Sequence, residues 1–148
     1  MQDNFAIYPS LKNMPVIITG GASGIGEQIT RAFVSQGSKV GFIDFDKDAS
    51  ERLCNDLNGQ LNFKICDLTQ IEDLKHAFNS LINEIGQPGA LVNNAARDDR
   101  HAWKDVTSEY FDDRIATNLK HQFFSIQAVA PEMIARGGGS IINLGSNS

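Results

Sequence analysis

The sequence of 148 residues is poor in cysteine, tryptophan and tyrosine, and it has fewer basic than acidic side chains. Its two cysteines, Cys54 and Cys66, do not have the spacing of a Cys-x-x-Cys redox pair or the number of a cysteine-rich metal site. We expect them to be reduced core thiols. Thirteen Lys and Arg against 18 Asp and Glu give a formal net charge of −5. Because a phosphate backbone needs a basic stripe, we expect no nucleic-acid partner.

Long apolar runs are also missing. None approaches the roughly 20 residues that a membrane-spanning helix needs, and residues 1–10 lack the basic patch and apolar core of a signal peptide. We therefore expect no membrane partner and a cytoplasmic location. Hydrophobic residues make up 41% and charged residues 21% of the sequence, which is typical of a globular protein. The length predicts one domain over residues 1–148.

Short apolar runs alternate with helical periodicities along the chain. The predicted strands are residues 16–18, 39–44, 61–65, 90–92 and 140–144. Capping patterns place helix starts near Asp48 and Thr69, and a longer helix starts near Thr107 with Pro131 toward its end. Strict alternation of strand and helix implies right-handed crossovers and an α/β fold, a doubly wound parallel sheet of the Rossmann type. We expect the sheet to be cut after its fifth strand.

A glycine-rich turn follows the first predicted strand and opens a helix. Gly20, Gly24 and Gly26 allow a tight turn and the close approach of a pyrophosphate to the backbone. The helix N-terminus offers N–H groups to that anion, and Ser23 adds a hydroxyl donor. The alternative is a glycine-rich turn without a ligand. The strand and helix on either side favour a dinucleotide site that includes Ile25.

An acidic residue, Asp44, ends the second predicted strand, 18 positions after Gly26. In a nucleotide-binding βαβ unit this position reaches the adenosine ribose, where a carboxylate accepts hydrogen bonds from the hydroxyls and repels a 2′-phosphate. Neither Ala22 nor Phe45 supplies a cation for such a phosphate. The sequence therefore predicts NAD rather than NADP as the cofactor.

The run from Thr19 to Gly26, together with Asn93-Asn94-Ala95 and Asn118, resembles the short-chain dehydrogenase/reductase family of the classical type. The resemblance extends from about Leu11 to the end of the sequence and corresponds to the N-terminal part of the family. It implies that Asn94 and Ala95 line the cofactor cleft. The resemblance also implies that Asp67 and Leu68, which lie outside these motifs, flank the adenine of the cofactor.

The same resemblance assigns two catalytic helpers. Asn118 corresponds to the asparagine that holds a water in the proton relay, and Ser146 to the serine that polarises the substrate oxygen. The Tyr-x-x-x-Lys pair of the family belongs on a helix after Ser146, and it is not among residues 1–148. Tyr8 and Lys12 have its spacing but precede the first strand, so we interpret that match as coincidence. We expect residues 1–148 alone to be inactive, and the catalytic helix and substrate loop to lie outside them.

Loop and helix residues, among them 98–101 and 118–121, show a closer likeness to bacterial sugar 1-dehydrogenases of this family, which oxidise aldoses such as D-xylose or L-fucose. The likeness implies a small-molecule substrate, an aldose oxidised at C1, and a homo-oligomer for the full-length protein. Two alternatives stay open. One is a dinucleotide-binding module without catalysis, and the other is a dehydrogenase of this family that acts on a non-sugar alcohol.

Two further groups of polar residues receive structural interpretations. Asp98, Asp99 and His101 share one loop, and without a second ligand cluster we expect solvated or sugar-contacting side chains and no metal. His121 lies one helical turn after Asn118, where packing of the helix is the expected role.

Overall fold

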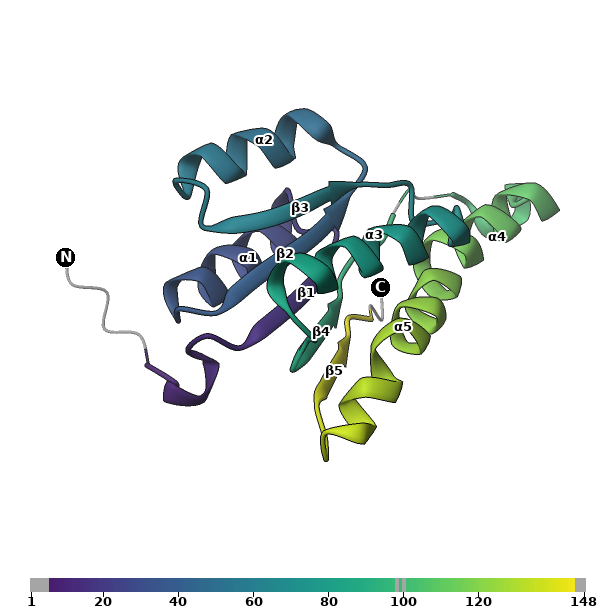
Figure 1. Ribbon diagram of the computed structural model, residues 1–148. Helices are drawn as coiled ribbons and strands as arrows, with labels where there is room; N and C mark the ends of the chain where they lie inside the picture. Colours follow the sequence, from purple (N-terminus) through teal and green to yellow (C-terminus); the bar gives the residue numbers. More distant parts are fainter. Residues whose placement is uncertain (1–5, 98, 100, 146–148) are drawn as a thin grey trace.

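The protein forms a parallel sheet with helices on both faces, as the computed structural model shows for residues 6–97, 99 and 101–145 (Figure 1). The strands are β1 Pro15–Thr19, β2 Lys39–Asp44, β3 Leu61–Ile65, β4 Ala90–Asn93 and β5 Ser140–Asn143. Their order across the sheet is β3-β2-β1-β4-β5, and all four pairings are parallel. The predicted Rossmann-type sheet is thus confirmed.

Helices connect the strands. They are α1 Gly24–Ser35, α2 Lys47–Asp56, α3 Ile71–Ile85, α4 Ser108–Ile115 and α5 His121–Ala135, with the π-helical turn η3 Ala116–Lys120 between the last two. Short 3₁₀ helices, η1 Pro9–Leu11 and η2 Trp103–Asp105, precede β1 and α4. Helices α1 and α2 pack on one face of the sheet, and α3 and α5 on the other (Figure 1).

The core consists of two apolar layers, because successive strand residues point to opposite faces. In β1, Ile17 enters the layer under α3 and α5, while Val16 and Ile18 enter the layer under α1 and α2. The cysteines also separate, Cys66 into the first layer and Cys54 against the second, and neither forms a disulfide. Burial raises the pKa of the Cys66 thiol to about 11, which fits the predicted core thiol.

Two predicted helix starts need correction. The N-cap of α2 is Asp46, whose carboxylate accepts from the Ala49 N–H at 2.9 Å, so the helix begins before Asp48. The capping box predicted from Thr69 is wrong, because the Thr69 hydroxyl donates to Asp67 Oδ1 instead and Gln70 precedes the first helical residue. Short polar side chains bond whichever backbone or side-chain partner is nearest, so spacing alone does not select the cap.

The long helix predicted from Thr107 contains an irregularity. Thr107 caps α4 as expected, since its hydroxyl accepts from the Tyr110 N–H at 3.2 Å, and Pro131 lies inside α5 near its end. Between α4 and α5 the backbone widens into the π-turn Ala116–Lys120. Single π-helical turns are frequent at functional sites. Among the described residues no helix combines the length and apolar character needed to cross a bilayer.

Strand β5 lies at one edge of the described sheet, where its Ile141 and Ile142 are 37% and 45% exposed. Beside it, an apolar groove of about 370 Å³ lies between α1, η1 and the ends of β4 and β5, with Phe33, Ile142 and Leu144 among its walls. An exposed apolar edge strand is a template for pairing with another chain.

We predict that a polypeptide of residues 1–148 alone self-associates, so that its light scattering per unit mass rises with protein concentration. Ile142→Lys should reduce the rise, because a charge at an edge opposes strand pairing. The matched control is Ile134→Lys, which changes an exposed residue of α5 away from this edge and should leave the scattering unchanged. A strictly monomeric, cooperatively folding wild-type polypeptide would contradict the prediction.

Candidate cofactor site

The candidate site lies at the carboxyl ends of β1 and β4, which are neighbours in the sheet. After β1 the chain turns into α1 on one face, and after β4 it leads to α4 and α5 on the other side (Figure 1). The two connections leave the sheet on opposite faces, so that a crevice opens between them. Open α/β sheets bind their ligands at such a point, where the strand order reverses.

Close packing explains two of the motif glycines. Gly20 has φ +67°, and a Cβ there would lie 2.8 Å from the Ala95 Cα. A Cβ on Gly26 would lie 1.7 Å from the Gly20 carbonyl oxygen. Any side chain at either position would therefore push apart β1, the start of α1 and the loop after β4.

The N-terminus of α1 is open to a ligand. Ser23 is the N-cap, its side chain makes no capping hydrogen bond, and it is exposed together with Gly24 and Ile25. The first N–H groups of a helix have no partner within the helix and carry the positive end of its dipole. Ser23, Gly24, Ile25 and the buried Gly26 thus form an anion cradle of backbone donors and one hydroxyl.

Asp44 at the end of β2 is buried and fastens this turn. Its Oδ2 accepts from the Ala22 N–H at 2.9 Å and its Oδ1 from the Asp46 N–H at 3.1 Å. Each carboxylate oxygen keeps a second lone pair for a ribose hydroxyl. The side chain that follows, Phe45, is 80% exposed, and the next cation, Lys47, pairs with Glu51 at 3.6 Å.

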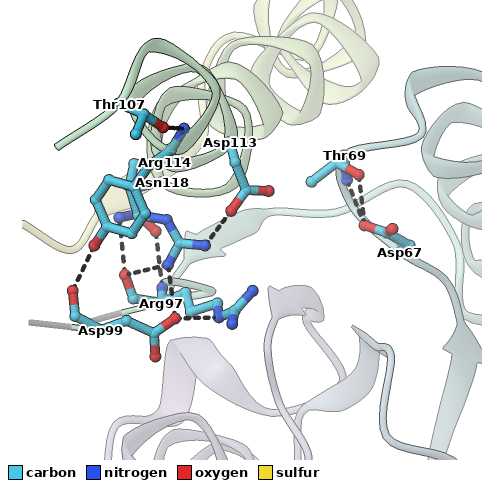
Figure 2. A network of polar contacts seen from close by, with 9 residues as sticks. Asp67, Thr69, Arg97, Asp99, Thr107, Asp113, Arg114 and Asn118 are labelled. Atoms are coloured by element: carbon cyan, nitrogen blue, oxygen red, sulfur yellow. Dashed lines mark hydrogen bonds and ion pairs between the residues drawn. The ribbon is translucent and has the colours of Figure 1, made fainter.

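Asp67 and Leu68 follow β3, the strand next to β2, and so lie beside Asp44 at the carboxyl ends of the strands. Asp67 Oδ1 accepts from the Thr69 N–H at 2.9 Å and from the Thr69 hydroxyl at 2.8 Å (Figure 2). Leu68 packs against the layer under α3 and α5. Their contact with an adenine stays a prediction.

The loop after β4 is tied to the end of β1. The N–H groups of Asn94 and Ala95 donate to the Thr19 hydroxyl oxygen at 3.1 and 3.2 Å. The Asn94 side chain donates to the carbonyls of Thr19 and Gly20 at 3.2 and 2.8 Å. Asn94 and Ala95 therefore adjoin the glycine turn, and their contact with a cofactor stays a prediction. The role of Thr19 was missed, although it directly precedes the first glycine.

Asn118 lies in the π-turn and holds the same loop further along. Its Oδ1 accepts from the Arg97 N–H at 2.8 Å, and its Nδ2 donates to the Arg97 carbonyl at 3.1 Å (Figure 2). The two bonds fix the backbone of Arg97 as a strand partner would. The predicted water in a proton relay stays a prediction for Asn118.

An ion-pair network, which the sequence analysis did not anticipate, continues this loop. Arg114 of α4 reaches the Arg97 carbonyl and the Asp99 carboxylate, each at 3.4 Å, and also pairs with Asp113 (Figure 2). Arg97 Nε lies 2.7 Å from the same Asp99 carboxylate, and the Tyr110 hydroxyl donates to the Asp99 carbonyl at 2.5 Å. The spacing of Tyr110 and Arg114, one helical turn apart, was the only available signal.

The other residues singled out in the sequence have different outcomes. Ser146 and Asp98 lie outside the described residues, and in the described part of the chain no cluster of three metal-ligand residues is present. Tyr8 sits beside the C-terminal end of α1, where its N–H donates to Gln36 Oε1 at 2.9 Å. The 12 residues of α1, about 18 Å of helix, separate it from the glycine turn, which fits the interpretation of the Tyr8–Lys12 spacing as coincidence.

Comparison with known proteins agrees with this geometry. Residues 15–148 match the family described as short chain dehydrogenase. The chain is 49% identical over 146 residues to D-xylose 1-dehydrogenase of Caulobacter vibrioides, covering 97% of this chain and 57% of that protein. It is 42% identical to a probable galactose dehydrogenase of Rhizobium meliloti, covering 94% and 56%.

A solved structure with a similar fold, that of gox2181, superposes with a TM-score of 0.85 at 27% identity, covering 91% of this chain and 54% of that one. The chain thus spans little more than half the length of these relatives. The matched residues include the glycine turn, Asp44, the Asn94–Ala95 loop and Asn118. The chain belongs to the short-chain dehydrogenase family.

Proposed function

We propose that the protein that contains this chain is an NAD-dependent oxidoreductase that oxidises an aldose at C1. The observation that carries the proposal is the joining of the open α1 N-terminus and the buried Asp44 by one hydrogen bond, from Ala22 to the carboxylate. An anion cradle and a ribose acceptor in one rigid unit match the two ends of an adenosine diphosphate.

The residues present fit a dinucleotide. A Cβ at Gly24 would meet no atom within 4 Å, so the turn is open to a ligand there, and Ser23, Gly24, Ile25 and Gly26 would supply donors for the pyrophosphate. NAD bound there supplies the acceptor for a hydride from the substrate. The chain itself orients the cofactor: Asp44 would hold the ribose, Asp67 and Leu68 would flank the adenine, and Asn94 and Ala95 would line the cleft toward the nicotinamide.

Asn118 and Ser146 are proposed to act on the substrate side. Asn118 would hold a water that connects the proton relay to solvent, and Ser146 would donate a hydrogen bond to the substrate oxygen. Neither is a base that accepts a proton from an alcohol at neutral pH. The base would come from a Tyr-x-x-x-Lys pair beyond residue 148.

The sugar assignment is supported by the two relatives whose names specify D-xylose and galactose. The relatives also include a 7alpha-hydroxysteroid dehydrogenase of Bacteroides fragilis at 32% identity, so a non-sugar alcohol is the second candidate substrate. A dinucleotide-binding module without catalysis is the alternative in another class. A stop codon directly after Ser148 in the natural gene would favour the module.

We further propose a homo-oligomer for the full-length protein. Phe111, Ile115, Leu119 and Phe123 recur every fourth position along α4, the π-turn and α5, and all four are at least 40% exposed. An apolar stripe of this kind is typical of an interface with another subunit. The cytoplasmic location and the lack of nucleic-acid and membrane partners stay predictions.

The first prediction concerns the cofactor. In parallel fluorescence titrations NADH should bind about tenfold or more tightly than NADPH, because a carboxylate facing a 2′-phosphate is repulsive. Asp44→Asn should bring the affinities for NADH and NADPH closer together, because asparagine carries no charge that repels the 2′-phosphate. Asp46→Asn is the matched control, since asparagine caps α2 equally well and Asp46 is not assigned to the ribose. A preference for NADPH, or equal affinity for the two, would overturn the assignment of Asp44.

The second prediction concerns catalysis. A polypeptide of residues 1–148 should show no NADH formation with any aldose, because loss of a general base costs about a hundred- to ten-thousand-fold. The polypeptide extended through the Tyr-x-x-x-Lys pair should oxidise a pentose or 6-deoxyhexose. The assay follows NADH absorbance across a panel of sugars.

Two results of this assay would contradict the proposal in different ways. Activity of the 1–148 polypeptide that disappears on Tyr8→Phe would show that the Tyr8–Lys12 pair acts after all. Activity of the extended polypeptide only on steroids or acyl thioesters would keep the family and remove the sugar assignment.

A further inference from the structure

The inner face of α5 is formed by residues four positions apart, all of them buried. His121 and Ser125 occupy its first half and Val129 and Met133 its second half. The apolar half packs into the layer under α3 and α5. The polar half begins at a histidine with no exposed surface, and a fully buried imidazole requires partners for its nitrogens.

The hydrogen bonds of His121 define its tautomer. Its Nδ1 lies 2.6 Å from the Thr117 carbonyl oxygen in the π-turn. A carbonyl only accepts, so Nδ1 carries the proton and Nε2 of the neutral ring is an acceptor. Nε2 lies 3.5 Å from the Thr19 hydroxyl.

The Thr19 hydroxyl is the shared partner. Its oxygen accepts from the N–H groups of Asn94 and Ala95, which uses both lone pairs. Its single proton is therefore free to be donated to His121. One unbroken series of hydrogen bonds runs from the π-turn through His121 and Thr19 to the loop after β4.

We propose that His121 is a positioning residue for the cofactor cleft: by accepting the Thr19 proton it orients the Thr19 hydroxyl oxygen toward the Asn94 and Ala95 N–H groups. The inference rests on the proposed NAD-binding function, since that loop is the cleft wall. Without the acceptor, the Thr19 proton has no fixed direction and the hydroxyl oxygen holds the Asn94 and Ala95 N–H groups less firmly, while the Asn94 side chain still ties the loop to Gly20.

Protonation of His121 would reverse this arrangement. An imidazolium donates from both ring nitrogens. Both lone pairs of the Thr19 hydroxyl oxygen already accept from Asn94 and Ala95, so the Nε2–H of His121 would face the Thr19 O–H, which is also a donor. Burial lowers the pKa of His121 and outweighs the opposite effect of the Thr117 carbonyl. The charged and titratable groups on the neighbouring elements come from four segments. They are Glu72, Asp73, Lys75, His76 and Glu84 of α3, Cys66 and Asp67 after β3, Arg97, Asp99 and His101 of the loop after β4, and Glu109, Tyr110, Asp112, Asp113, Arg114 and Lys120 of α4 and the π-turn. None of these contributes to the shift, which is due to burial.

The test uses the complete natural polypeptide and NADH as the probe. His121→Leu should weaken NADH binding about tenfold at pH 7.5, the effect of one lost hydrogen bond. His121→Gln, whose Oε1 supplies an acceptor that does not titrate, should retain the wild-type affinity. Between pH 7.5 and 6.5 the wild-type affinity should stay constant, and it should fall relative to that of His121→Gln only at pH values below 6.5, because burial lowers the pKa of His121 from 6.5.

A double-mutant cycle identifies the partner. Thr19→Val removes the hydroxyl with little change of shape, and combining it with His121→Leu should weaken binding no more than the stronger single change does, because both break the same series. Additive effects, or failure of His121→Gln to restore affinity, would overturn the proposal and leave His121 a packing residue.

A readout without cofactor separates this proposal from the proposed function. In ¹⁵N NMR spectra the wild-type His121 should be the Nδ1–H tautomer, and the amide signals of Asn94 and Ala95 should shift alike in His121→Leu and Thr19→Val. Unshifted amides or the other tautomer would refute the positioning role. Shifted amides in a wild-type protein that does not bind NADH would refute the proposed function alone.

Discussion

The parallel pairing of β1 with β4 is the contact on which the site depends. It places Thr19 beside Asn93, and it brings the loop at Asn94 to the glycine turn although Asn94 and Thr19 are 75 positions apart. Backbone pairing fixes the distance between the two strand ends, and their connections leave on opposite faces of the sheet. The strand order therefore produces the crevice, and side chains line it.

Small residues allow the elements around this contact to approach closely. Gly20 packs closely against Ala95, and Gly26 packs closely against the Gly20 carbonyl. Asp44 adds a bond from the neighbouring strand β2 to Ala22. The glycine turn is therefore fixed from three directions before any ligand binds, and such preorganisation lowers the entropy that a ligand must lose.

The loop after β4 is held differently, through side-chain bonds from the helical segment 108–135. Asn118 bonds the backbone of Arg97 twice, and Arg114 reaches the same residue one turn earlier. The π-turn, which contains Asn118, changes the angular position of the residues that follow, and His121 directly after it is buried. One widened turn thereby lets a single helical segment bond both the outer loop and the sheet.

The strand and helix order, the parallel sheet and the place of the glycine turn could be predicted from the sequence, because apolar periodicity and glycine spacing are local properties of the chain. The sequence did not predict that Asp46 caps α2 or that the N-cap of α3 makes no side-chain bond, since several polar candidates lie within reach along the chain.

The hydrogen-bond partners of Thr19, His121, Arg97 and Arg114 could not be predicted in this way, because most of them come from distant parts of the chain. His121 has the spacing of a packing residue, and the sequence holds no sign that a hydroxyl 102 positions away lies opposite its ring. Such bonds depend on the angle at which a helix crosses a sheet and on one π-turn. Both are set by the sum of many packing contacts, which no local pattern encodes.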